Sequence, residues 1–294
     1  LIGIFTFVII WLARRNLEIF IKIFIMFSLY FSLIYSGFPY VALLMQILIG
    51  TQENALLYAA IINLVLIITL WRYPEWYIVN LVGILVGAGV ITMIGISFVP
   101  TLIIIFMIIA AIYDHWAVNG SKHMLELADT MIDLKLPILL VAPKEKGYSF
   151  LDEQEGVMEK TVTKPTQEDW DDPKIAAVKV EKSGRDALFM GLGDVIFPGM
   201  LVISSISFLP QTGPVLGSLP MTSFFGWIHL DALMVGMGTL FGGLIGYFGL
   251  MTQVAKGKPQ AGLPLLNGGS ILGYFITGII VYGPSELIQQ ISLF

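Results

Sequence analysis

Two aspartates differ from the other acidic residues of this chain because each lies inside a long apolar segment. Asp114 lies in the run IYDHW, and Asp194 lies in the run GLGDVI. Ionisable side chains inside a membrane are energetically costly and usually serve a function. Two neighbouring carboxylates at low dielectric share one proton, so one can activate a water molecule while the other protonates a peptide carbonyl oxygen. Such a pair is suited to aspartic proteolysis.

A second chemistry fits the same two residues. Paired acids inside a membrane also relay protons or cations in channels and transporters, and the residues alone leave both interpretations open. Asp231 is a third acid near an apolar segment, but it lies beside His229 close to the outer end of that segment. We interpret Asp231 as an interfacial residue.

Helical rise predicts that the two aspartates lie at a similar depth. Asp194 follows Arg185 by nine residues, and Asp114 precedes Lys122 by eight. In helices these separations place the carboxylates about 13 Å and about 12 Å from the same membrane face. The glycines beside Asp194 remove side-chain bulk, so a substrate backbone could approach closely.

The composition indicates a membrane protein. Of 294 residues, 56% are hydrophobic and only 13% are charged, about half the fraction usual in soluble domains. The absence of cysteine excludes disulfides and thiolate metal sites, and three histidines are too few for an all-protein metal cage, so we expect no cofactor or metal. A net charge of −5 argues against a nucleic-acid partner.

Apolar runs predict an all-α, polytopic membrane bundle of eight helices. The predicted spans are 1–13, 17–36 with a continuation to about 49, 54–71, 76–96, 100–119, 186–209, 226–250 and 264–283. For the second run we favour one long bent helix, although Pro39 lies inside it. The first run covers only about 20 Å, so we expect this helix to begin earlier in the native chain.

The basic residues predict the orientation. All 16 Lys and Arg fall on one set of connections or snorkel towards it, whereas 37–53, 97–99, 210–225 and 284–294 contain none. The positive-inside rule then predicts that the loop 120–185 is cytoplasmic. We expect this loop to be largely flexible and the chain to lie in a cell membrane. It separates an N-terminal helical part, 1–119, from a C-terminal part, 186–294.

Two further segments have structural predictions. The run from Ile138 to Ala142 lies between Pro137 and Pro143, is too short to span a membrane and is β-prone. We hypothesise that it pairs with an unwound substrate as an added strand, with Leu140 at its centre; an inert connector is the equal alternative. Glycines recur every four residues at 238, 242 and 246, which predicts close helix packing.

The residues around the aspartates form a recognisable pattern. Tyr113-Asp114 and the run GLGD, residues 191–194, resemble the YD and GxGD motifs of the presenilin and signal-peptide-peptidase intramembrane aspartyl proteases. The family's Pro-Ala-Leu motif corresponds to Ala261-Gly262-Leu263, where alanine and glycine replace proline and alanine. In this departure the chain resembles archaeal presenilin homologues.

The resemblance implies an endopeptidase that cleaves transmembrane helices, and it favours proteolysis over an ion leak. It implies nine spans, of which this chain would lack the first, and a catalytic pair formed by Asp114 and Asp194. No obligatory partner subunit is implied, and a homo-oligomer is left open. The resemblance also assigns neighbours of the active site, Tyr113, Gly191, Leu192 and Gly193, and substrate-positioning residues, Ala261, Gly262 and Leu263.

Overall fold

A computed structural model describes most of the apolar segments of the chain. The described residues are 18–51, 53–117, 139–143, 149, 187–216, 228–254 and 261–287. The predicted helix 1–13 and most of the loop 120–185 lie outside them. The basic connection with Lys256 and Lys258 and the C-terminal residues 288–294 also lie outside.

The described part is mostly helical. Its helices are α2 (Glu18–Ile49), α3 (Ala55–Arg72), α4 (Trp76–Gly95), α5 (Pro100–Trp116), α8 (Leu192–Phe208), α9 (Leu230–Val254) and α10 (Leu263–Tyr282), followed by the short 3₁₀ helix η5 (Pro284–Glu286). Five are long and apolar enough to cross a membrane, whereas α5 and α8 are shorter apolar helices. Helix α2 continues through Pro39 as one element, as predicted. The chain is therefore a polytopic helical membrane protein.

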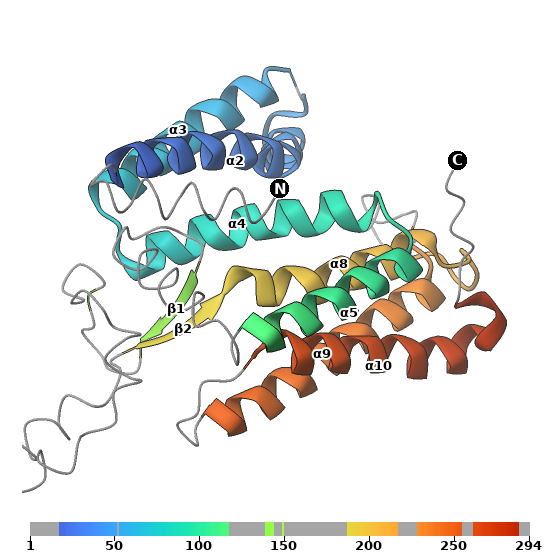
Figure 1. Ribbon diagram of the computed structural model, residues 1–294. Coiled ribbons are helices and arrows are strands. Elements are labelled where there is room, and N and C mark those ends of the chain that lie inside the picture. The colour runs from blue at the N-terminus through green and yellow to red at the C-terminus, as the bar shows by residue number, and fades with distance from the viewer. Residues whose placement is uncertain are drawn as a thin grey trace, which may run out of the picture. The chain divides into compact units, whose positions relative to one another are not determined.

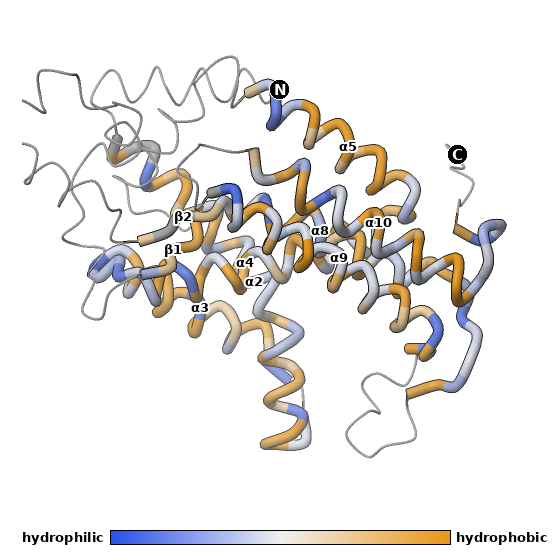
Figure 2. The backbone as a smooth tube through the Cα atoms, turned by 90° about the horizontal axis from the view of Figure 1, so that it is seen from below, coloured by the Kyte–Doolittle hydropathy of each residue, from blue (hydrophilic) through white to orange (hydrophobic). Residues whose placement is uncertain are grey.

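Apolar residues predominate along these helices (Figure 2), and many of their large side chains are exposed. Ile245 of α9 is 72% exposed and Ile280 of α10 is 76% exposed, and large apolar side chains are exposed along α2 and α3 as well. Water would penalise so much exposed apolar surface, whereas lipid chains solvate it. The bilayer is thus the solvent of these faces.

Two short strands form an antiparallel pair. Strand β1 (Leu139–Pro143) pairs with β2 (Ala187–Gly191), with Leu140 opposite Met190. The strand predicted at 138–142 is confirmed over its described residues. The helix predicted over 186–209 is wrong in its first residues, since α8 begins only at Leu192. A short apolar run does not by itself distinguish a strand from a helix. Residues 187–191 form a strand because they pair with β1, which is distant in the sequence.

The chain forms two compact units, Leu1–Gly89 with His123–Leu192 and Val90–Lys122 with Gly193–Phe294. In the first unit α2 packs on α3, and the buried Asn63 donates from Nδ2 to the Leu33 carbonyl oxygen at 3.0 Å. The two-stranded sheet belongs to the same unit. There the Asn80 side chain of α4 is bonded to the backbone of Val141 in β1.

In the second unit α10 packs between α5 and α9 (Figure 1). Gly242 and Gly246 of α9 face backbone atoms of α10, and Gly238 faces the Thr277 side chain, so closely that a Cβ on any of the three would collide with α10. The predicted close packing of these glycines is confirmed. Buried Tyr274 donates to the Leu287 carbonyl oxygen at 2.9 Å, which ties the residue after η5 to the core.

Candidate active site

Asp114 lies in the last turn of α5 and is only 7% exposed. Its Oδ2 accepts a hydrogen bond from the backbone N–H of Leu263 at 3.1 Å. Leu263 is the first residue of α10, where backbone N–H groups have no partner within the helix. The carboxyl group of α5 therefore caps the start of α10.

Asp194 lies in the first turn of α8 and is half-buried. A Cβ atom built on Gly262 would lie only 2.9 Å from Asp194 Oδ2. The missing side chain of Gly262 thus leaves the space that the Asp194 carboxyl group occupies. Since β2 precedes α8, the helical rise used for the sequence-based depth of Asp194 does not hold before Leu192.

The two aspartates converge on one dipeptide. Asp114 Oδ2 accepts from the amide of Leu263, and Asp194 faces the α-carbon of Gly262. Three helices far apart in the sequence, α5, α8 and the start of α10, meet at this point. A water molecule and a peptide carbonyl placed between two such acids have an acid and a base within reach.

The other residues predicted to neighbour the active site lie at different places around the two aspartates. Tyr113 is 55% exposed, and its ring lies 6.2 Å from that of Trp116, so it covers the outside of α5 rather than the acids. A Cβ atom on Gly193 would meet nothing within 4 Å, so no packing requires that glycine. Gly191 ends β2, Leu192 begins α8 and Ala261 precedes the dipeptide.

Leu140 belongs to β1, and its neighbour Val141 has an unexpected partner. Val141 N–H donates to Asn80 Oδ1, and Asn80 Nδ2 donates to the Val141 carbonyl oxygen, both at 2.8 Å. The amide side chain thus pairs with β1 as another strand would. Sequence reasoning missed Asn80, although an asparagine in an apolar segment is itself a signal.

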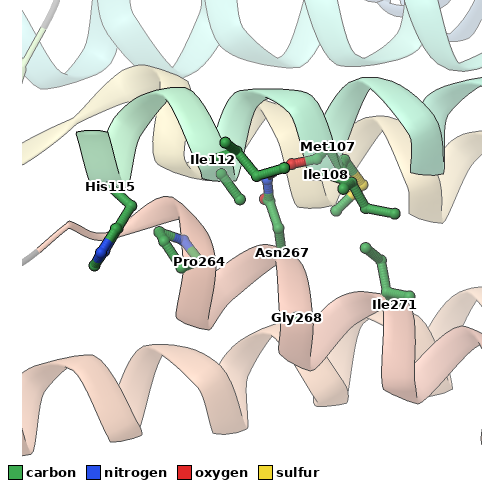
Figure 3. Close-up of a pocket in the computed structure, with 9 residues that line it drawn as sticks. Met107, Ile108, Ile112, His115, Pro264, Asn267, Gly268 and Ile271 are labelled. Carbon is green, nitrogen blue, oxygen red and sulfur yellow. Dashed lines mark hydrogen bonds between the residues drawn. The ribbon is translucent and has the colours of Figure 1, made fainter. Parts of the chain in front are cut away.

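A second asparagine, also missed from the sequence, lies in the second unit. Asn267 of α10 is 1% exposed and donates from Nδ2 to the Met107 carbonyl oxygen of α5 at 2.9 Å. Beside it is a cavity of about 380 Å³ between α5 and α10 (Figure 3). Apart from Asn267 and His115, the cavity is lined by Met107, Ile108, Ala111, Ile112, Pro264, Gly268 and Ile271.

Across the described residues, no group of three or more His, Cys, Asp or Glu side chains is placed to hold a metal ion. A two-carboxylate site does not need one, because the acids themselves activate water. The chemistry that this geometry supports is general acid and base catalysis on a carbonyl group.

Comparison with known proteins decides the family. The family model described as signal-peptide peptidase, presenilin aspartyl protease matches residues 1–283. The chain belongs to this family. A search of curated proteins found no match.

Two solved structures are similar to this chain. A presenilin family intramembrane aspartate protease in space group C222 is 27% identical, with a TM-score of 0.56, and the match covers 95% of this chain and 82% of that one. A structure with the same description in space group P2 is 24% identical, with a TM-score of 0.51; the match covers 93% of this chain and 82% of that one and supports the fold alone. The family model and the first structure favour an intramembrane aspartyl protease over an ion leak.

Proposed function

We propose that this chain hydrolyses peptide bonds of transmembrane helices and that Asp114 and Asp194 are its catalytic pair. The observation that carries the proposal is the convergence of both carboxyl groups on Gly262 and Leu263.

The proposed reaction moves protons between the pair, one water molecule and the peptide. The ionised member takes a proton from water, whose oxygen bonds to the peptide carbonyl carbon, while the protonated member donates to the carbonyl oxygen. In the resulting tetrahedral intermediate, the protonated acid gives its proton to the peptide nitrogen, and the ionised acid takes a proton from one hydroxyl group of the intermediate as the C–N bond breaks. The products are a carboxylic acid and an amine, and the pair again holds one proton.

Substrate positioning is assigned to the residues around the pair. Ala261, Gly262 and Leu263 form the start of α10 against which the carboxyl groups lie, so a substrate peptide held there is within their reach. The open space at Gly193 supports a close approach of the substrate beside Asp194. We assign Tyr113, Gly191 and Leu192 only as neighbours of this site.

The membrane arrangement that goes with this function has eight spans in the chain and a cytoplasmic loop at 120–185 in a cell membrane. It is supported by the basic residues, since all Lys and Arg lie on one set of connections except Lys22, which is close enough to snorkel to the same face. The same division gives the three parts 1–119, 120–185 and 186–294. The proposed partners are transmembrane substrates and lipid, with no obligatory subunit; a second copy of the chain is left open.

The strand proposal changes in one respect. Asn80 bonds both backbone groups of Val141, so these groups point away from β2. Because successive residues of a strand direct their backbone groups to opposite sides, Leu140 and Ala142 are the residues of β1 that bond β2. Pro143 points the same way as Val141, so its missing N–H costs no hydrogen bond of the sheet. By the same alternation the backbone groups of Phe189 in β2 point away from β1, towards an edge that no other strand of the described residues covers, which we call the open edge of β2. We therefore propose that an unwound substrate adds to β2, which leads by chain continuity to Asp194, while Leu140 holds β2 in place.

Single proline substitutions test this assignment. Phe189→Pro removes an N–H from the open edge, so cleavage is expected to fall about tenfold while thermal stability stays near that of the wild type. Leu140→Pro breaks the β1–β2 pair and is expected to lower both cleavage and the melting temperature, whereas Leu140→Val keeps both. Equal cleavage by Phe189→Pro and its control Phe189→Ala would contradict substrate pairing at this edge.

The proposed function is tested with the purified chain in lipid vesicles that contain one transmembrane-helix peptide and no other protein. Mass spectrometry is expected to find two fragments whose new ends lie within the membrane-spanning part of the peptide. Proton flux across the same vesicles without any cleavage product would contradict proteolysis and support the ion leak.

A further inference from the structure

Asn267 is a buried polar residue in an otherwise apolar contact between α5 and α10. It is 1% exposed, and its neighbours in the cavity are mainly aliphatic side chains (Figure 3). Its Nδ2 donates to the Met107 carbonyl oxygen, but within the described part of the chain its Oδ1 has no hydrogen-bond partner. The amide group is therefore only half satisfied.

This half-satisfied amide is a poor way to stabilise a pair of helices. A buried acceptor without a donor is destabilising, and interhelical hydrogen bonds inside membranes contribute little on average. Leucine has the same number and branching of side-chain heavy atoms, and the aliphatic surroundings of Asn267 suit it. A reason other than stability is needed for an asparagine here, and fixing the register of two helices is the best-attested role of a lone buried asparagine.

The register of α10 on α5, to which Asn267 contributes, also determines where the start of α10 lies relative to Asp114. On α10 it lies four residues after Leu263, whose N–H bonds Asp114 Oδ2. On α5 its partner Met107 lies seven residues, or about two turns, before Asp114. The two hydrogen bonds thus join antiparallel helices at two levels. One bond alone would permit the helices to pivot about it, whereas two define both the rotation and the sliding of α10 on α5.

We propose that Asn267 is a positioning residue of the protease. It holds α10 in the register that keeps the amide of Leu263 on Asp114 and the α-carbon of Gly262 beside Asp194. Asn267 does not touch the reacting atoms. The inference rests on the proposed function, because it assigns Asn267 a role in orienting the same two carboxyl groups.

The first test compares Asn267→Leu with the matched variant Asn63→Leu. Asn63 is also buried and also donates to a backbone carbonyl of a neighbouring helix, but it lies in the other compact unit. Asn267→Leu is expected to lower kcat about ten- to a hundredfold, with KM within twofold and the melting temperature unchanged or higher. Asn63→Leu is expected to leave kcat within about twofold. If Asn267→Leu does not fold, Asn267→Ala removes the same donor with less bulk and is assessed by the same criteria.

The second test asks whether Asn267 acts through Leu263. Leu263→Pro removes the N–H that bonds Asp114, and proline is tolerated at the first position of a helix; Leu263→Ala is its control with the N–H retained. In the Leu263→Pro background, Asn267→Leu is expected to lower kcat less than twofold further, because coupled residues are not additive.

A kcat of Asn267→Leu equal to that of the wild type would overturn the inference. So would an Asn267→Leu substitution that lowers kcat by the same factor in the Leu263→Pro background as in the wild type. Cleavage by the wild type and by Asn63→Leu in the same vesicles tests the proposed function separately. A failure of the proposed function is therefore distinguishable from a failure of the inference about Asn267.

Discussion

Replacing Asp114 or Asp194 with asparagine is expected to lower the cleavage rate about a thousandfold or more in each single variant. Asparagine keeps the size of the side chain and its oxygen can still accept from the Leu263 N–H, but it neither takes a proton from water nor gives one to a carbonyl oxygen. The initial rate of fragment formation in vesicles, at a fixed ratio of chain to substrate, measures the loss.

Asp231→Asn is the control for this experiment. Asp231 Oδ2 accepts from Thr212 Oγ1 at 2.9 Å, a bond that asparagine can keep, and no second carboxyl group is described beside it. Cleavage by this variant is expected within about twofold of the wild type, since Asp231 takes no part in proton transfer. Substantial cleavage by Asp114→Asn or by Asp194→Asn would contradict a catalytic pair.

Substitutions of Gly262 are expected to lower cleavage in proportion to their size. The Cβ atom of alanine would lie 2.9 Å from Asp194 Oδ2 and 3.4 Å from Leu250 Cδ2, so a small shift of the carboxyl group would accommodate it. Valine adds two methyl groups in the same place and must displace Asp194. We expect a loss below about tenfold for alanine and of about a hundredfold or more for valine, because small misplacements of reacting groups are costly.

Backbone strain does not explain this expected loss. Gly262 has φ −77° and ψ −44°, a right-handed helical conformation that does not require glycine. The control is Gly249→Val in α9, where a Cβ atom would meet nothing within 4 Å and wild-type cleavage is expected. Equal rates for Gly262→Ala, Gly262→Val and the wild type would show that Asp194 does not need the space beside Gly262.

The sequence predicted the two aspartates because an acid inside an apolar segment is costly and rare. It also predicted most of the helices, since runs of about 20 apolar residues leave few alternatives in a membrane. It could not predict from composition that Asp114 and Asp194 meet at Gly262 and Leu263. Apolar helices carry little information about which neighbours they contact, and only the resemblance to family motifs brought these residues together.

The features missed from the sequence depend on contacts between distant segments. Residues 187–191 have no periodicity that separates a strand from a helix, and pairing with β1 makes them a strand. Asn80 and Asn267 are single asparagines in apolar runs, and their roles depend on which backbone groups lie opposite them. Polar residues of this kind indicate that a partner exists, but not which one.

The pH dependence of kcat tests most directly whether Asp114 and Asp194 act as one pair. With both acids protonated no base is present, and with both ionised no acid is present, so only the singly protonated pair is active. Initial cleavage rates from about pH 4 to about pH 9 in one lipid composition are expected to follow a bell with an acidic to neutral optimum. A rate that keeps rising to the alkaline end of this range would contradict a pair that shares one proton.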